Sequence, residues 1–228
     1  MEALLDIRSQ VPSASQRTAD DVAARVAAHE WVNDEYRHLV LDAPAPAPQA
    51  RAGQFFHLDC PRTGEDRPFL RRPMSVYKAD PHKGQVEFLY KVTGAGTRGL
   101  ATLRVGDTLR MLGPLGVGFT LDARWRNVVV LGRGVGLATL APLAETAAAQ
   151  GVGVTAILSA RGSAQVMSAG RFQETGARVE ILLDSDGSSA VDNVERLLRR
   201  VAGDGRADAF FTCGSSRATS RSCSPRGM

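Results

Sequence analysis

The first half of the chain alternates short apolar stretches with glycine, proline and charged residues. Residues 22–41 are rich in alanine, but their β-branched and aromatic positions, followed by a Pro–Ala run at 44–48, favour two strands of a meander over a helix. Further strands are predicted at residues 54–58, 70–77, 86–92 and 106–112. Short strands at this spacing, separated by glycine and proline, predict a closed or nearly closed antiparallel β-barrel.

The hydrophobic pattern changes near residue 121. Residues 127–131 form a continuous apolar run, which is typical of a parallel strand buried on both faces. A glycine-rich turn and an Ala/Leu-rich segment with helical spacing follow, at 132–136 and 137–150. More strands are predicted at 154–158, 178–183 and 209–213, with a helix ending near 176 and another at 191–201. Alternating strands and helices predict a doubly wound α/β domain with a parallel sheet.

These patterns predict two domains of unlike architecture. Residues 1–21 are expected to be a partly disordered extension, because they are polar and Ser-rich after a short apolar start. The barrel is expected at residues 22–122 and the α/β domain at 123–214. Residues 215–228 form a polar, Ser/Arg-rich tail without a pattern, and a truncation or a segment read out of frame is expected there.

Composition excludes several classes of protein. The chain has 228 residues and a net charge of +4, and its arginines are scattered, so no nucleic-acid partner is expected. No apolar run approaches the roughly 20 residues that span a bilayer, and no signal peptide is apparent, so a cytoplasmic protein without a membrane partner is expected. The three cysteines form neither a disulfide framework nor a close metal cluster, and the four histidines show no ligand spacing.

The stretch Arg72-Pro73-Met74-Ser75 is the first candidate for chemistry. Proline cannot donate to a central ladder, so the stretch is predicted to begin a strand or to lie at a sheet edge. The planar guanidinium of Arg72 would match phosphate oxygens two at a time, and Ser75 would offer a hydroxyl to a ring bound beside that phosphate. The alternative is an edge strand with a solvated arginine.

Two glycine-rich turns are candidates for anion binding. Gly132, Gly134 and Gly136 lie between a predicted strand and a predicted helix, where backbone N–H groups bind nucleotide phosphates. A plain tight turn is the alternative, because the full G-x-G-x-x-G pattern is missing and no acidic residue ends the second strand. Residues 94–97, Gly-Ala-Gly-Thr, would bind an anion at the start of a short helix or form a hairpin turn.

Two further residues occupy strand ends. Arg161 follows the second strand of the α/β half, as either a phosphate contact or a surface residue. Cys213 ends the last strand, and ligand crevices of open α/β sheets lie at the carboxyl ends of strands. Cys213 is therefore predicted to face a substrate, although a buried small residue is the alternative.

Together these pieces resemble the ferredoxin–NADP reductase superfamily, and within it most closely the electron-transfer subunits of type B dihydroorotate dehydrogenases. The matching pieces occur in the family's order from about residue 22 to residue 214, and their conjunction is far more specific than any one of them. They are residues 72–75, 89–91, 96–97, 113–119, 132–136 and 213–214.

The resemblance implies two cofactor sites. Arg72, Pro73, Met74 and Ser75 would line FAD, with Arg72 on the pyrophosphate and Ser75 near flavin N5. The rest of FAD would be held by Leu89, Tyr90, Lys91, Gly96 and Thr97. The pyrophosphate of NAD(P)H would meet Gly132, Gly134 and Gly136, and Cys213 would lie near the nicotinamide. Ser75 and Cys213 are thus the candidate catalytic residues.

The resemblance also implies a function, namely an oxidoreductase that passes electrons from NAD(P)H through FAD to an acceptor. That acceptor would be the catalytic subunit of a dihydroorotate dehydrogenase in pyrimidine biosynthesis, or another electron acceptor. A stand-alone flavin or ferredoxin reductase and a non-catalytic nucleotide-binding subunit are the alternatives. NADH is favoured over NADPH by the resemblance alone.

The chain departs from the family near its C-terminus. The family's subunit carries a [2Fe–2S] cluster on four cysteines near its end, and such a cluster ordinarily needs all four thiolates. Only Cys213 and Cys223 occur in this region. A [2Fe–2S] cluster is therefore not expected in this chain, which puts the relay to a partner subunit in doubt but leaves the FAD site in place.

Overall fold

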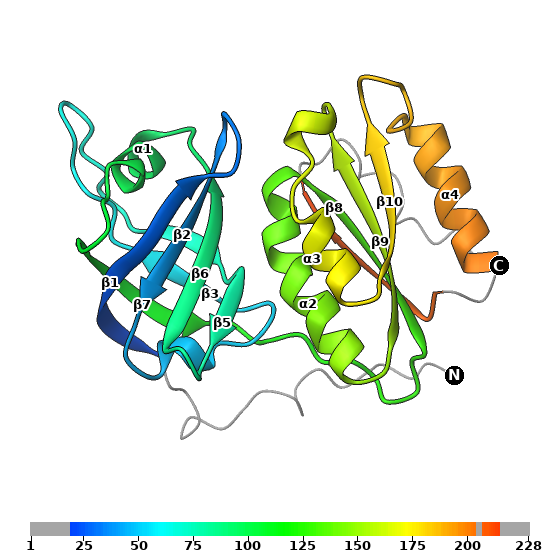
Figure 1. Ribbon diagram of the computed structural model, residues 1–228, viewed down its shortest axis with the longest axis horizontal. Helices are drawn as coiled ribbons and strands as arrows, with labels where there is room; N and C mark the ends of the chain where they lie inside the picture. Colours follow the sequence, from blue (N-terminus) through cyan, green and yellow to red (C-terminus); the bar gives the residue numbers. More distant parts are fainter. Residues whose placement is uncertain (1–18, 204–206, 215–228) are drawn as a thin grey trace, which may run out of the picture.

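The computed structural model describes residues 19–203 and 207–214. Within them the chain forms two halves, an antiparallel β-barrel and a parallel α/β sheet, which lie side by side (Figure 1). The predicted two-part fold is thereby confirmed. The expectations for the tail at 215–228 and for residues 1–18 of the N-terminal extension lie outside the described residues.

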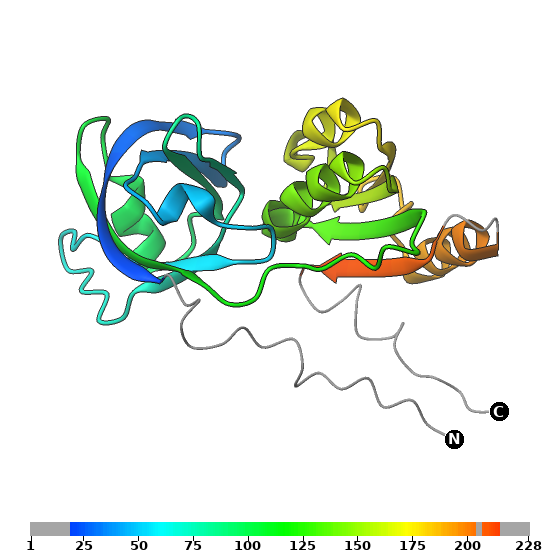
Figure 2. The same ribbon diagram turned by 90° about the horizontal axis from the view of Figure 1, so that it is seen from below.

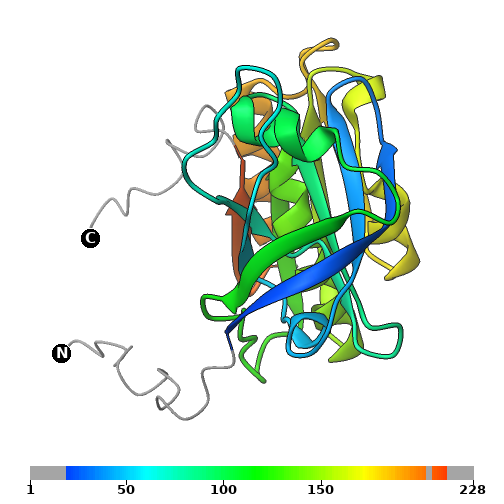
Figure 3. The same ribbon diagram turned by 90° about the vertical axis from the view of Figure 1, so that its left-hand side faces the viewer.

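Seven strands of the described chain pair in the order β4-β3-β7-β1-β2-β6-β5, each antiparallel to its neighbours. The edge strands β4 and β5 follow one another in the chain, so the sheet must curl until its two edges approach. Figure 3, which views the molecule from the barrel, shows β1 and β7 side by side across its front. The strands are β1 (Asp20–Trp31), β2 (Tyr36–Asp42), β3 (Phe55–Leu58), β4 (Arg72–Ser75), β5 (Lys78–Asp80), β6 (Gln85–Lys91) and β7 (Thr108–Leu115).

The barrel interior follows from alternation along the strands. In β1, Val22, Ala24 and Val26 are buried while the residues between them are exposed, because successive side chains point to opposite faces. Asp20 and Asp21, which were expected in the extension, form the start of β1. Their backbone pairs with β7, and this ladder outweighs the low strand propensity of aspartate.

The barrel confirms the position predicted for Pro73 and decides between the two alternatives left open for residues 94–97. Pro73 lies in the edge strand β4, where its missing N–H removes no bond from a central ladder. Residues 94–97 begin the short helix α1 (Ala95–Ala101) rather than a hairpin. The Pro–Ala run at 44–48 leads into a 3-10 turn, Ala47–Gln49.

The second half holds a parallel sheet of four described strands in the order β10-β9-β8-β11. Helices α2 and α3 cover one face and α4 covers the other (Figure 2). The strand order reverses between β8 and β11, and such a switch point opens a crevice at the carboxyl ends of the strands. The elements are β8 (Asn127–Arg133), α2 (Leu137–Ala149), β9 (Gly153–Ala160), α3 (Ala169–Glu174), β10 (Arg178–Leu183), α4 (Val191–Gly203) and β11 (Ala209–Cys213).

The two halves share an interface next to that crevice. Tyr36 of β2 and Leu89 of β6 belong to the same buried apolar cluster as the residues of α2. At one side of this cluster, Arg171 of α3 donates a 2.6 Å hydrogen bond to the carbonyl of Tyr77 between β4 and β5. The Tyr77 hydroxyl lies 3.0 Å from Ser168 Oγ. The barrel and the sheet are therefore held together by apolar packing and by hydrogen bonds.

Candidate functional site

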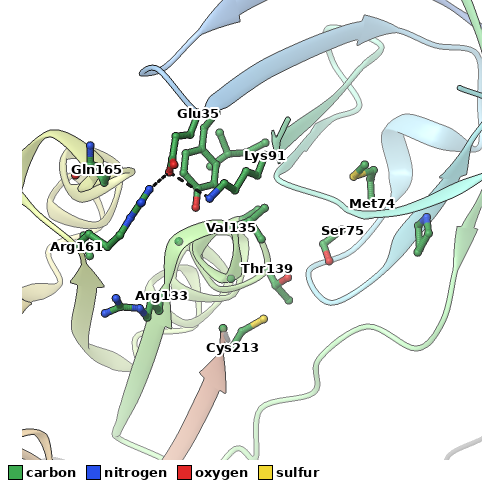
Figure 4. Close-up of a pocket in the computed structure, with 18 residues that line it drawn as sticks. Glu35, Met74, Ser75, Lys91, Arg133, Val135, Thr139, Arg161, Gln165 and Cys213 are labelled. Carbon is green, nitrogen blue, oxygen red and sulfur yellow. Dashed lines mark ion pairs between the residues drawn. The ribbon is translucent and has the colours of Figure 1, made fainter. Parts of the chain in front are cut away.

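A cavity of about 650 Å³ lies between the two halves, at the carboxyl ends of β8, β9 and β11 (Figure 4). The barrel contributes Glu35, Tyr36, Pro73, Met74, Ser75, Leu89 and Lys91 to its lining. The α/β half contributes residues 133–136, 138–139, 160–161, 165 and 213–214. The cavity thus brings together most of the residues that the sequence singled out, from both halves.

On the barrel side, strand alternation decides which side chains reach the cavity. Leu89 and Lys91 of β6 line it, together with Met74 and Ser75 of β4. The side chain of Tyr90 points the opposite way, into the barrel, where it is 1% exposed and its hydroxyl lies 2.9 Å from His29 Nε2. Any contact of Tyr90 with a cofactor in the cavity would therefore come from its backbone.

Arg72 and α1 lie beside the cavity rather than in its lining. A Cβ added to Gly96 would come within 2.8 Å of Arg72 Cγ, so the arginine side chain passes directly over this glycine. Arg72 Nη1 donates a 2.6 Å hydrogen bond to the carbonyl of Leu70. Thr97 Oγ1 accepts hydrogen bonds from the N–H groups of Thr93 and Gly94, at 2.9 and 3.0 Å, and so caps α1. Arg72, Gly96 and Thr97, which the resemblance places on FAD, are therefore neighbours.

On the α/β side, the glycines of the turn after β8 are required by close approach. Gly134 has a φ of +56°, and a Cβ there would come within 2.8 Å of the Tyr36 hydroxyl. A Cβ on Gly136 would lie 2.2 Å from the carbonyl oxygen of Cys213. Both glycines line the cavity at the N-terminus of α2, where backbone N–H groups favour an anion.

Gly132, the last residue but one of β8, is in register with Cys213, the last residue of the neighbouring strand β11. Gly132 does not line the cavity, because α2 covers it: a Cβ there would lie 2.4 Å from Leu137 Cδ2. Gly132 therefore permits close packing of α2 on the sheet. Cys213 does line the cavity, on the side of Thr139 and across from Ser75 (Figure 4).

Three cations and one carboxylate line the cavity. Glu35 Oε2 lies 3.3 Å from Lys91 Nζ and also pairs with Arg161 Nη2. The hydrogen bond from Arg161 lowers the pKa of the Glu35 carboxyl, so this carboxylate is ionised at neutral pH. The third cation, Arg133 of β8, forms an ion pair within the α/β half: its Nη2 lies 2.5 Å from Asp184 Oδ2.

Sequence reasoning did not single out several of these cavity residues. Arg133 lies inside the glycine-rich turn and Thr139 in the first turn of the following helix, so their position next to a candidate phosphate site was available as a signal. Glu35 ends the turn between β1 and β2, and Tyr36 is the first residue of β2; neither carries a local signal of function. Gln165, in a short loop after β9, carries none either.

Comparisons with known proteins assign the chain to a family. The family model described as an oxidoreductase FAD-binding domain matches residues 23–119. The chain is 34% identical to the dihydroorotate dehydrogenase B (NAD(+)) electron transfer subunit of Desulforamulus reducens, over 84% of this chain and 72% of that protein. It is 33% identical to the subunit of the same name from Streptococcus pneumoniae serotype 4, over 84% of this chain and 74% of that protein. This chain belongs to the family of dihydroorotate dehydrogenase B electron transfer subunits.

Solved structures agree with this family and with the two-part fold. A structure of NADH-dependent reduced ferredoxin–NADP oxidoreductase matches with a TM-score of 0.72 and 25% identity, over 86% of this chain and 68% of that chain. Ferredoxin–NADP⁺ reductase from Plasmodium falciparum shares the fold, with a TM-score of 0.71 and 11% identity over 88% of this chain and 87% of that chain. The resemblance to the ferredoxin–NADP reductase superfamily is therefore confirmed.

The α/β side of the cavity has features that suit an anionic ligand. Gly134 and Gly136 line it at the N-terminus of α2, and Lys91, Arg133 and Arg161 add three positively charged side chains to the lining. Among the residues that the structure describes, no three His, Cys, Asp or Glu side chains are grouped to hold a metal ion. No helix in the described ranges is long and apolar enough to cross a membrane.

Proposed function

We propose that this electron transfer subunit is an FAD-dependent oxidoreductase, which takes electrons from NAD(P)H and passes them to an acceptor. The single observation that carries the proposal is the shared cavity: the FAD-binding domain lines one side and a glycine-rich strand–helix turn lines the other. The proposed domains are residues 22–122 for FAD and 123–214 for the nicotinamide nucleotide.

On the barrel side, Arg72 is proposed to bind the pyrophosphate of FAD. The backbone of Pro73 and the side chains of Met74 and Ser75 would lie along the flavin, with the Ser75 hydroxyl near N5. Their place in β4, at the mouth of the cavity, supports these roles. The remaining barrel contacts would come from Leu89, Tyr90, Lys91, Gly96 and Thr97.

On the α/β side, the turn with Gly134 and Gly136 is proposed to meet the pyrophosphate of NAD(P)H, and Cys213 to lie near the nicotinamide. Gly132, which was expected to share this contact, instead lies under α2 and permits its close packing. Bound flavin and nicotinamide supply the hydride chemistry themselves. The chain's contribution is to hold the two rings in reacting geometry and to exclude water from the space between the halves. Apolar side chains such as Leu89 and Val135 line that space.

The proposed acceptor is the catalytic subunit of a dihydroorotate dehydrogenase, because the relatives are named as its electron transfer subunits. The same name supports a role in pyrimidine biosynthesis. Since the relatives are longer than the matched region, the hand-over of electrons to that partner is part of the proposal.

The test measures flavin binding and flavin reduction separately. The purified chain, supplied with FAD and desalted, should retain flavin absorbance, and NADH should bleach that absorbance under anaerobic conditions. Retained flavin without bleaching would favour a non-catalytic nucleotide-binding subunit. A folded chain that retains no flavin would contradict the proposal.

Arg72→Ala is the matching variant. It removes the guanidinium that packs over Gly96, so flavin retention should fall at least about tenfold, the scale of a lost charge-assisted contact. Flavin content after desalting is the measurement. Arg199→Ala is the control, because Arg199 lies on the surface of α4, far from the cavity lining, and should leave flavin content unchanged. Unchanged flavin content in Arg72→Ala would count against this assignment.

A further inference from the structure

Glu35 reaches from the barrel across the mouth of the cavity to the α/β half (Figure 4). It belongs to the turn between β1 and β2, and this turn is fixed by Asn33. Asn33 Oδ1 accepts hydrogen bonds from the N–H groups of Glu35 and Tyr36, at 3.0 and 3.1 Å. Asn33 Nδ2 also donates to the carbonyl of Ala164 in the other half, at 3.4 Å. The Glu35 carboxylate is therefore held over the loop that follows β9.

Arg161, which pairs with Glu35, occupies a position that contacts the nucleotide ribose in doubly wound sheets. Arg161 directly follows β9, the second strand of the α/β half, and lines the cavity. In such sheets an acidic residue after the second strand binds the ribose 2′-hydroxyl of NAD, whereas an arginine nearby accommodates the 2′-phosphate of NADP. Taken alone, Arg161 would favour a nucleotide with a 2′-phosphate.

The contacts of Arg161 reverse that preference. We propose that Glu35 is a specificity-determining residue, which masks Arg161 and makes the cavity select dinucleotides without a 2′-phosphate. The inference deepens the proposed function and rests on it. It locates the discriminating carboxylate in the barrel half, on the turn between β1 and β2.

Charge balance at the cavity mouth gives the physical reason. A 2′-phosphate carries nearly two negative charges at neutral pH and would have to break the Glu35–Arg161 pair before it could use the arginine. It would then lie beside an ionised carboxylate, and such like-charge contact is an effective means of rejecting a ligand. Lys91 cannot replace Arg161 as the cation for this phosphate, because the Lys91 ammonium lies 3.3 Å from the same Glu35 oxygen. Hydrogen bonding by Arg161 lowers the pKa of Glu35, so the mask persists at neutral pH.

The experiment measures binding rather than turnover. The probes are ADP-ribose and 2′-phospho-ADP-ribose, which lack nicotinamide, and their affinities are determined by titration calorimetry on the intact chain. Glu35→Gln keeps the size of the side chain but removes its charge. This variant should bind 2′-phospho-ADP-ribose at least about tenfold more tightly than the unchanged chain, as expected for one gained charge-assisted hydrogen bond, and ADP-ribose about equally. Glu195→Gln removes a carboxylate from an arginine pair on α4 and should change neither affinity.

A second substitution distinguishes unmasking from a general gain of positive potential. In Glu35→Gln/Arg161→Ala, the gain for 2′-phospho-ADP-ribose should disappear, because the double-mutant cycle isolates the coupling of the two residues. An equal gain for both probes, no gain in Glu35→Gln, or a gain that survives loss of Arg161 would each overturn the inference. If the unchanged chain and all variants bind neither probe while remaining folded, the nucleotide site of the proposed function fails, and the inference fails with it.

Discussion

At the scale of single residues, close backbone approach decides the shape of the candidate site. The carbonyl of Cys213 lies against the Cα of Gly136, and the hydroxyl of Tyr36 lies against that of Gly134. Neither position has room for a Cβ, and Gly134 also needs a positive φ. Glycine at these two positions lets the end of β11 and the barrel close in on the N-terminus of α2, and so sets the walls of the cavity.

Substitution Gly136→Ala tests this requirement. The new Cβ would lie 2.2 Å from a backbone oxygen that cannot rotate away, so β11 or α2 must shift. We expect the free energy of unfolding to fall by about 1–3 kcal/mol, the usual cost of overpacking, as measured by urea denaturation. Gly170→Ala in α3 is the control, because nothing lies within 4 Å of its added Cβ. It should be neutral or slightly stabilising, and equal losses in both variants would contradict the argument.

Cys60 gives a second prediction at this scale. Burial raises the pKa of its thiol to about 11, although nearby Arg72 opposes the shift. The folded state therefore favours the neutral thiol. The stability that this thiol contributes is fully present below its ordinary pKa of 9.0, and it is lost as the pH rises towards about 11. At pH 8, iodoacetamide should modify partly exposed Cys213 and spare Cys60, as measured by peptide mass spectrometry. Modification of native Cys60 as fast as in denaturant would contradict this.

At the scale of elements, α3 connects the α/β half to the barrel. Arg171 holds Glu145 of α2 through two hydrogen bonds, at 2.6 and 2.8 Å, and the Tyr77 carbonyl of the barrel through a third. Its guanidinium also lies 4.3 Å from the centre of the Tyr77 ring. Three elements thus meet at one side chain, which stabilises the halves in the arrangement that forms the cavity.

Substitution Arg171→Ala should weaken this junction. Arg171 is 13% exposed, so its loss leaves the Tyr77 carbonyl with one partner fewer in a poorly hydrated site. The free energy of unfolding should fall by about 1–3 kcal/mol, as expected for hydrogen bonds to a charged group. Thermal unfolding followed by circular dichroism is the measurement. Arg178→Ala, at an exposed pair with Glu180, should have little effect, and a similar midpoint for both variants would argue against the junction.

At the scale of the whole molecule, the chain has a separate apolar core in each half and a cavity where the halves meet. The barrel core contains aromatic side chains such as Phe56 and Phe88, whose rings pack edge to face at 5.7 Å. The sheet has one apolar layer under α2 and another under α4. This arrangement leaves the carboxyl ends of β8, β9 and β11 open to the barrel, so both halves contribute to the one cavity described above.

A pair of phenylalanines shows how tertiary position sets stability. Phe88 is 0% exposed in the barrel core, whereas Phe69, in the loop before β4, is 95% exposed. Phe88→Ala should lower the free energy of unfolding by about 3–5 kcal/mol, because it leaves a cavity in a packed core. Phe69→Ala should leave it nearly unchanged, because no packing is lost. Urea denaturation of both variants checks the contrast, and losses of similar size would contradict it.

Most of the fold could be predicted from the sequence because its signals are local. The bounds of β10 and β11 equal the predicted ranges 178–183 and 209–213, since each strand is a short run between turn residues. The predicted strand–turn–helix setting of Gly134 and Gly136 is likewise present, because the three elements follow one another directly in the chain and each has its own local pattern. Strand periodicity also accounts for the opposite directions of Leu89 and Tyr90, although the sequence could not show which face was the cavity.

By itself, then, the sequence determined the two architectures, their order and the glycine-rich turn between β8 and α2. These features depend on hydrophobic periodicity and on the backbone freedom of glycine, and both act over a few residues. Only the tertiary structure decided which charges face the cavity and which of them are paired. Glu35 and Arg161 pair across the two halves, next to the hydrogen bond between Asn33 and Ala164, which lie 131 positions apart in the chain. No local sequence pattern predicts a contact over such a separation. The pairing exists because apolar packing between the halves brings the turn after β1 over the end of β9.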